Sequence, residues 1–114
     1  MKTGKVMPLA QVFVSVRDPR SARQVRHDLA ELLTVAVCGV LCRADDFAEI
    51  EAWANERIDW LRGFLALENG IPSHDTFARV FALLDPREFE AAFRRWVGMV
   101  IPAADVAWFV TLDF

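Results

Sequence analysis

Two stretches of this sequence carry side chains suited to binding nucleic acid. The first is an N-terminal arm in which arginines recur at every third position: Arg17, Arg20, Arg23 and Arg26. If the arm is helical, this spacing places them along one side, where each can neutralise a phosphate. A solvated linker whose arginines pair with acidic residues of the body would have the same pattern. The sequence leaves both interpretations open.

The second stretch is a predicted helix that begins after Ser73 and carries His74, Thr76 and Arg79, which we expect to reach the groove of bound DNA.

Few other residues have the spacing of a reactive site. His74 and Asp75 are adjacent, so on a helix their side chains point about 100° apart and form no relay. We expect His74 to help start the helix or to contact a partner. The carboxylates that follow residue 46 are expected on a solvated face.

The elements that position these residues can be read from turns and apolar spacing. Asn69-Gly70 favours a turn, and Ser73 can cap the amides of a new helix. The apolar residues Phe77, Val80, Phe81 and Leu84 then recur at helical spacing. A short helix entered through a tight turn is typical of helix-turn-helix proteins. One more amphipathic helix of a bundle is the alternative.

Further helices are predicted on both sides of this stretch. Residues 28–43 are apolar on every side, which indicates an enclosed helix, and Gly39 within it indicates the close approach of a neighbour. Asp46 and Glu49 have the spacing of a capping box, and the helix they start is expected to break near Asn55-Glu56.

The C-terminal part is predicted to continue with one helix and one strand. Asp85, Pro86 and Glu88 predict a capped helix start with a capping box, and Pro102 is expected to end that helix. Residues 106–112 are predicted to form a buried strand. Val12 to Val16 alternates weakly and favours a short extended segment.

These patterns together predict a mainly α fold: a compact bundle of about five helices with a helix-turn-helix-like segment and a C-terminal orphan β-strand. Cys38 and Cys42 lie four apart on one predicted helix, where two buried small side chains are favoured over a disulfide or a metal site. We therefore expect no metal site and a reduced, cytoplasmic setting.

The composition fits a single domain with an uneven charge. The chain has 114 residues, 54% of them hydrophobic, and a net charge of −3. Residues 1–27 carry six basic residues and one acidic residue (+6 − 1 = +5), and the remainder carries seven basic and fifteen acidic residues (+7 − 15 = −8). DNA contact is therefore expected mainly in the arm. The longest apolar stretch, Leu29 to Cys42, is too short for a membrane span, which needs about 20 residues.

A resemblance to a known family covers most of the chain. N-G-I-P-S-H-D-T-F-A-R-V-F at residues 69–81 is followed by A-L-L-D-P and an aromatic-rich helix ending at Trp96. D-P-R, L-A-E-L-L-T-V-A-V-C-G-V-L, D-D-F-A-E-I-E-A-W and D-W-L-R-G-F-L precede it in order. Over roughly residues 17–114 these segments resemble the N-terminal DDE transposase-associated domain of H-repeat-associated insertion-sequence transposases.

In that family a catalytic domain of ribonuclease-H type follows, and its first acidic residue ends the first strand. V-A-W-F-V-T-L-D-F resembles this strand, so the resemblance places Asp113 at the first acid. The family usually continues with Gly and Lys, whereas Phe114 follows here. Two-metal sites need clustered carboxylates, and the other two acids have no counterpart in this sequence. We therefore expect no functional catalytic residue and no cofactor, although intact family members would be expected to use a divalent metal such as Mg²⁺.

The resemblance implies three parts: a basic arm over residues 1–27, a helical accessory domain over 28–102, and the first strand of a truncated ribonuclease-H-like domain over 103–114. It implies a truncated transposase module that binds transposon-end DNA and does not cut it. A protein-interaction module that forms homo-oligomers, or an inert transposase remnant, is the alternative. No membrane partner is expected.

Overall fold

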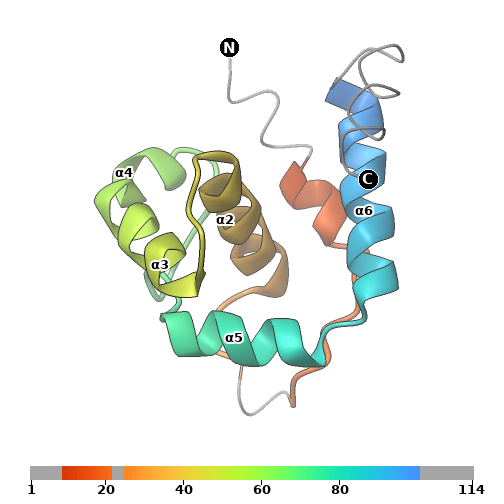
Figure 1. Cartoon of the computed structure of the whole chain (residues 1–114), viewed down its shortest axis with the longest axis horizontal. Coiled ribbons are helices and arrows are strands. Elements are labelled where there is room, and N and C mark those ends of the chain that lie inside the picture. Colours follow the sequence, from red (N-terminus) through yellow and green to blue (C-terminus); the bar gives the residue numbers. More distant parts are fainter. Residues whose placement is uncertain (1–8, 22–24, 101–114) are drawn as a thin grey trace.

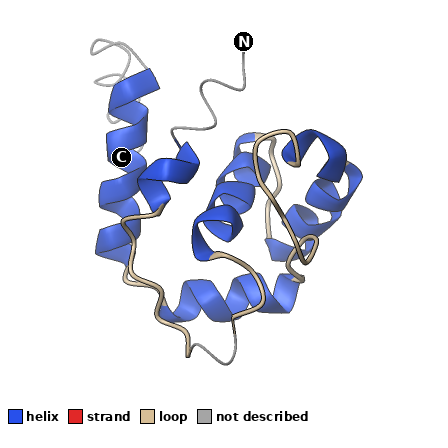
Figure 2. Cartoon of the chain, turned by 180° about the vertical axis from the view of Figure 1, so that it is seen from behind, coloured by secondary structure: helices blue, strands red, loops and turns tan. Residues whose placement is uncertain are grey.

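A computed structural model describes residues 9–21 and 25–100, with side chains up to residue 98. Its helices are residues 9–13, α2 (Leu29–Leu41), α3 (Phe47–Glu56), α4 (Ile58–Leu61), α5 (His74–Leu83) and α6 (Pro86–Val100). Within this part the chain is mainly helical and has no strand (Figures 1 and 2). The mainly α class is therefore confirmed, with a helix count near the predicted five. The strand predicted at 106–112 and the helix stop at Pro102 lie outside the described residues.

Helix α2 forms the centre of the core, with α3 on one side and the N-terminal helix on the other (Figure 1). Every residue from 29 to 39 except Glu31 is buried, which confirms the predicted enclosed helix for this part. Val40 and Leu41 at its end are exposed, so the prediction of an enclosed helix up to residue 43 is wrong there. Its start is capped by Asp28, whose carboxylate accepts the Glu31 backbone N–H at 3.0 Å. The buried hydroxyl of Thr34 donates to the carbonyl of Ala30 at 2.7 Å, so α2 buries this polar side chain with a partner.

Gly39 allows α2 and α3 to approach closely, as predicted. A Cβ on Gly39 would lie 3.2 Å from Cγ1 of Ile50 in α3. Helix α3 begins after Asp46, whose carboxylate accepts the Glu49 backbone N–H at 2.8 Å. Glu49 reaches back to the amide of Asp45 (2.7 Å) instead of Asp46, one residue away from the predicted capping box. The predicted break is confirmed, because α3 ends at Glu56 and α4 begins at Ile58.

The N-terminal segment belongs to the core. Leu9, Phe13 and Val16 are buried, and the ring of Phe13 stacks on Phe89 of α6 with 5.4 Å between centroids. The extended segment predicted for residues 12–16 is wrong, because residues 9–13 are helical and a hydrogen-bonded turn follows. Leu9 and Phe13 are i, i+4 neighbours on one helical face, and the turn that follows brings Val16 into the same core. The boundary predicted at residue 28 remains a prediction.

The tight turn predicted before α5 is confirmed. Gly70 has a φ of +78°, and its amide donates to the carbonyl of Leu67 at 3.0 Å. Ser73 caps α5, since its hydroxyl accepts the Thr76 backbone N–H at 3.2 Å. The preceding helix α4 ends at Leu61, so residues 62–73 separate the two helices. This connection is longer than the three to four residues of a helix-turn-helix turn, and the tight turn at residues 67–70 is only one part of it.

Glu31 of α2 holds this long connection against the core. Its carboxylate accepts the backbone N–H groups of Ala66 at 2.8 Å and Leu67 at 3.1 Å. Leu67 has a positive φ of 47°, an uncommon conformation for a residue with a side chain. Two charge-assisted hydrogen bonds at this point therefore determine the path of the chain toward α5.

Helix α6 begins at Pro86 as predicted, with the Asp85 carboxylate accepting the Arg87 backbone N–H at 2.9 Å. The predicted capping box is wrong for Glu88. Its carboxylate accepts the backbone N–H of Arg17 at 2.9 Å and so ties the N-terminal segment to α6. Such a contact joins residues that are distant in sequence, so local spacing cannot reveal it.

The two cysteines have different surroundings, and both are free thiols. Cys38 is buried as predicted, and burial raises the pKa of its thiol to about 11. Cys42 is exposed at the end of α2, so the prediction of two buried cysteines holds only for Cys38. None of the described helices is both long and apolar enough to cross a bilayer.

Candidate nucleic-acid interface

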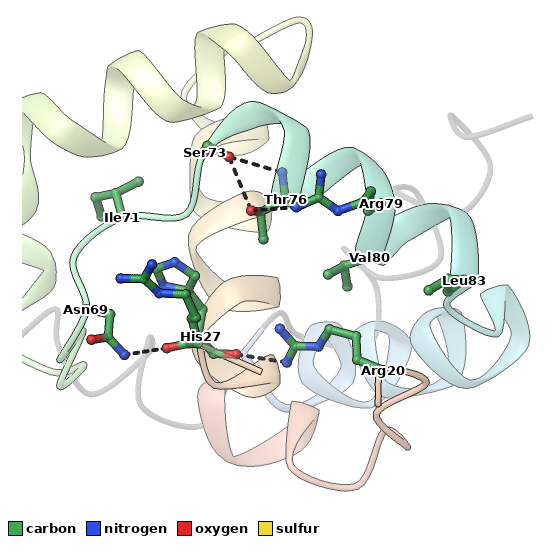
Figure 3. Close-up of a pocket in the computed structure, with 10 residues that line it drawn as sticks. Arg20, His27, Asn69, Ile71, Ser73, Thr76, Arg79, Val80 and Leu83 are labelled. Atoms are coloured by element: carbon green, nitrogen blue, oxygen red, sulfur yellow. Dashed lines mark hydrogen bonds between the residues drawn. The ribbon is translucent and has the colours of Figure 1, made fainter. Parts of the chain in front are cut away.

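A hollow of about 660 Å³ lies between the end of the N-terminal segment and α5 (Figure 3). Its lining combines basic, polar and aliphatic side chains: Arg20, Arg26, His27, Asn69, Ile71, Ser73, Thr76, Arg79, Val80 and Leu83. The lining includes three arginines and no carboxylate. An anion that entered would therefore meet positive charge and hydroxyl groups on several sides.

Arg20 fixes the path of the segment that forms one wall of the hollow. Its guanidinium donates to both carboxylate oxygens of Asp18, from Nε at 2.9 Å and from Nη2 at 2.8 Å. Nη2 also donates to the carbonyl of His27 at 2.8 Å (Figure 3). These contacts leave the Arg20 side chain only 6% exposed. Arg20 therefore acts mainly as a structural residue that joins Asp18 to His27 within the N-terminal segment.

The opposite end of this wall is held by Asn69. Its side-chain Nδ2 donates to the carbonyl of Arg26 at 2.5 Å (Figure 3). This contact joins the turn before α5 to the end of the arm, so Arg26 and His27 lie beside α5 although 43 positions separate Arg26 from Asn69. The side chain of Arg26 is exposed and remains available to a ligand.

Helix α5 supplies the other wall. The Oγ of Ser73 and the Oγ1 of Thr76 lie 3.2 Å apart, and the guanidinium of Arg79 lies 3.5 Å from Thr76 Oγ1 (Figure 3). Arg79 is one turn along the helix and exposed. The positive end of the α5 dipole adds to this charge, because Ser73 is the residue that caps the helix.

The electrostatics of the hollow are evident at His27. Partial burial lowers the pKa of its imidazole, and the positive charges of Arg26 and Arg20 lower it further. A second hollow of about 390 Å³ shares Arg26, His27 and Asn69 but is also lined by three acidic residues, Asp28, Glu31 and Glu68. The two hollows therefore differ in charge, and the one against α5 is the more favourable for an anion.

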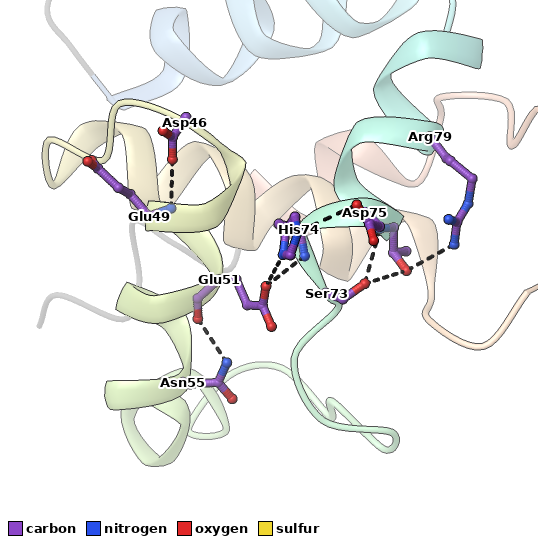
Figure 4. Close-up of polar contacts among 9 residues, drawn as sticks. Asp46, Glu49, Glu51, Asn55, Ser73, His74, Asp75 and Arg79 are labelled. Atoms are coloured by element: carbon purple, nitrogen blue, oxygen red, sulfur yellow. Dashed lines mark hydrogen bonds and ion pairs between the residues drawn. The ribbon is translucent and has the colours of Figure 1, made fainter.

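His74 lies outside this hollow. Its ring Nδ1 and its backbone N–H are both 2.8 Å from Oε1 of Glu51 in α3 (Figure 4). The hydrogen bond that the His74 ring donates to Glu51 raises the pKa of His74, and the same bond lowers the pKa of Glu51. Asp75 is farther away, with its Oδ1 3.5 Å from His74 Nε2. The pair of His74 and Glu51 attaches the start of α5 to α3.

The structure thus brings together four of the predicted DNA-contact residues, Arg20, Arg26, Thr76 and Arg79. Arg17 is exposed and lies beside the start of α6, where its backbone contacts Glu88. Arg23 and Asp113 lie outside the described residues. Residues 17–21 and 25–28 are not helical, so the described arginines do not form the predicted helical row.

Sequence reasoning missed His27 and Asn69 as part of this site. The signal for His27 was its position directly after Arg26, and the signal for Asn69 was its place in the turn before α5. Among the described ranges, no three His, Cys, Asp or Glu side chains lie close enough to hold a metal ion.

Comparison with known proteins gives the class to which this fold and site belong. The chain belongs to the DDE_Tnp_1-associated family, whose model matches residues 10–97. It is 44% identical over 102 residues to an uncharacterised protein in the dhlA 3' region of Xanthobacter autotrophicus. The aligned residues make up 89% of this chain and 35% of that protein. It is 34% identical over 82 residues to the H repeat-associated putative transposase YhhI of Escherichia coli K12. The aligned residues make up 72% of this chain and 22% of that protein.

A third relative is shorter. The inactive transposase YbfQ of Escherichia coli K12 is 40% identical over 63 residues, which cover 55% of this chain and 75% of that protein. The chain therefore spans about a third or less of the length of the first two relatives. No solved structure matches it. The resemblance to the transposase-associated domain of H-repeat transposases is confirmed, and the chain is a transposase-related accessory module.

Proposed function

We propose that this chain is a DNA-binding accessory module for DNA transposition and that DNA phosphates bind at the hollow beside α5. The observation that carries the proposal is the lining of this hollow, which includes the exposed Arg26 and Arg79 and no carboxylate. Membership in a transposase-associated family supports the same conclusion.

The residues that line the hollow have different roles in this proposal. Arg26 and Arg79 are exposed and supply the planar donors that pair with phosphate oxygens. Arg20 is held by Asp18, so it acts mainly by holding Arg26 and His27 in place. Thr76 offers a hydroxyl beside the charged groups. The acidic remainder of the chain disfavours other faces, so binding is directed to this site.

The remaining predicted contacts stay proposals. Arg17 and Arg23 would extend the phosphate contacts along the arm. The imidazole of His74 is held by Glu51, so groove contact from α5 depends chiefly on Thr76 and Arg79. The target is proposed to be transposon-end DNA. A polypeptide of these 114 residues is expected not to cleave or join strands, because Asp113 has no counterparts to the other two acids of the family's metal site.

Salt-dependent binding to duplex DNA tests the proposal. The probe is a fluorescent duplex of about 20 base pairs, and anisotropy is measured between roughly 50 and 200 mM salt. Combined Arg26→Ala and Arg79→Ala should weaken binding about tenfold at low salt and reduce the salt slope by about 2, since each lost contact removes about 0.9. Combined Arg87→Ala and Arg94→Ala removes the same charge from α6 and should leave binding near that of the parent. No complex at low salt would refute the proposal.

Self-association is the second candidate function, and an apolar groove favours it. The groove has a volume of about 310 Å³ and is lined by aliphatic and aromatic residues of α2, α3, α5 and α6. Val40 and Leu41 at its rim are 57% and 55% exposed. We propose a second copy of this chain as the occupant. Light scattering that shows a dimer disrupted by Leu41→Glu would support this, and a monomer at all concentrations would exclude it.

A further inference from the structure

We infer that the hollow beside α5 receives one unpaired nucleotide of single-stranded DNA, with the base inside and the phosphate at the rim. The inference rests on the proposed DNA-binding function and adds the chemical form of the ligand. Charge alone does not distinguish a duplex from a single strand, because both backbones carry the same phosphates.

The hollow is larger than a phosphate contact requires. A phosphate on a duplex is contacted at the surface, whereas this open hollow has a volume of about 660 Å³. Its wall includes the aliphatic side chains of Ile71, Val80 and Leu83. An ionic group gains nothing from such a wall, but the apolar face of a nucleobase does.

Flat groups suited to stacking line the hollow. The imidazole of His27 is half-buried in the lining, and this burial lowers its pKa. Imidazole rings and guanidinium planes stack on unpaired bases, and Arg26 lies next to His27 in the same wall. Stacking tolerates any base, so this arrangement predicts little sequence preference.

Polar groups also line the hollow. Ser73, Thr76 and Asn69 are part of the same lining and can form hydrogen bonds to the edge of a base. Arg79 on the same helix can hold the adjoining phosphate. The neighbouring hollow lacks this combination, because Asp28, Glu31 and Glu68 line it and would repel the phosphate.

The experiment compares three labelled probes by fluorescence anisotropy at one salt concentration. The first is a blunt duplex, the second is the same duplex with a four-thymidine overhang, and the third carries an overhang of four abasic residues. The abasic overhang keeps the phosphates and removes the bases. We expect the thymidine overhang to bind at least about fivefold more tightly than the abasic one, as expected for the stacking of one base.

Two variants of exposed aliphatic residues locate the effect. Leu83 is 59% exposed and lines the hollow, and Val14 is 72% exposed and lines neither the hollow nor the apolar groove. Leu83→Ala should reduce the ratio of thymidine to abasic affinity toward one, and Val14→Ala should leave the ratio unchanged. Arg79→Ala should instead weaken all three probes. Thermal unfolding of each variant shows that it remains folded.

The outcomes separate the two proposals. Equal affinity for the thymidine and abasic overhangs, together with duplex binding, overturns the nucleotide site and leaves the proposed function intact. A ratio that is the same in Leu83→Ala and the parent also overturns it. Failure of every probe to bind overturns the proposed function and the nucleotide site with it.

Discussion

Arg20 binds Asp18 through two nitrogens of its guanidinium, and a third hydrogen bond joins it to the carbonyl of His27. This pair converts one member of a regular arginine series into a structural residue. The segment it closes carries Arg26 to the edge of the candidate site. Loss of the pair should therefore affect folding before it affects binding.

We predict that Arg20→Ala lowers the free energy of unfolding by about 2 kcal/mol, measured by urea denaturation at pH 7. The value is below that of a fully buried pair, because the Asp18 side chain is 33% exposed. Arg87→Ala, which removes an exposed arginine of α6, should change it by less than about 0.5 kcal/mol. Equal effects of the two substitutions would contradict a structural role for Arg20.

A large side chain at position 39 should separate α2 from α3. A Cβ there already lies 3.2 Å from Ile50, so Gly39→Leu should cost about 3 kcal/mol in the free energy of unfolding or prevent folding. Ile50→Ala should partly restore stability in the double variant. Gly98→Leu is the matched control, since a Cβ at position 98 meets nothing within 4 Å among the described residues. A melting curve unchanged by Gly39→Leu would refute the close approach.

Glu31 should control the connection before α5. Its carboxylate accepts the amides of Ala66 and Leu67, so Glu31→Ala leaves two backbone donors without this partner. We expect a loss of about 2 kcal/mol in stability. Hydrogen exchange should accelerate first at these two amides, while amides of α2 change only with global stability. Unchanged protection at residues 66 and 67 would exclude this role.

The two histidines should give opposite pH dependence. The hydrogen bond to Glu51 raises the pKa of His74 above its ordinary value of 6.5. The stability that protonated His74 adds to the fold is therefore complete below pH 6.5 and decreases as the pH rises through the raised pKa. Burial lowers the pKa of His27, so protonating it destabilises the fold as the pH falls below 6.5.

Thermal unfolding between pH 5 and 8.5 measures this difference. The melting temperature of His74→Gln should fall furthest below that of the parent at pH 5 to 6, and the gap should narrow toward pH 8.5. His27→Gln should improve relative to the parent as the pH falls. Parallel curves for both variants would show that neither pKa shift contributes to stability.

Local sequence determined where most helices begin. Asp46, Ser73 and Pro86 mark the starts of α3, α5 and α6, and each was recognisable because helix-start signals act within three or four residues. Gly39 could be interpreted for a similar reason, since an unusual residue inside an apolar helix implies a close neighbour. The family resemblance was also present in the order of short segments.

Only the tertiary structure decided which charged groups pair and which remain available to a ligand. Glu88 bonds to Arg17 across 71 positions, and His74 bonds to Glu51 across 23 positions, so spacing along the chain gives no signal for either pair. Arg20 and Arg26 look equivalent in sequence, but one is enclosed by Asp18 and the other is exposed. Packing of the helices sets these differences, because it brings together side chains whose separation depends on the whole fold.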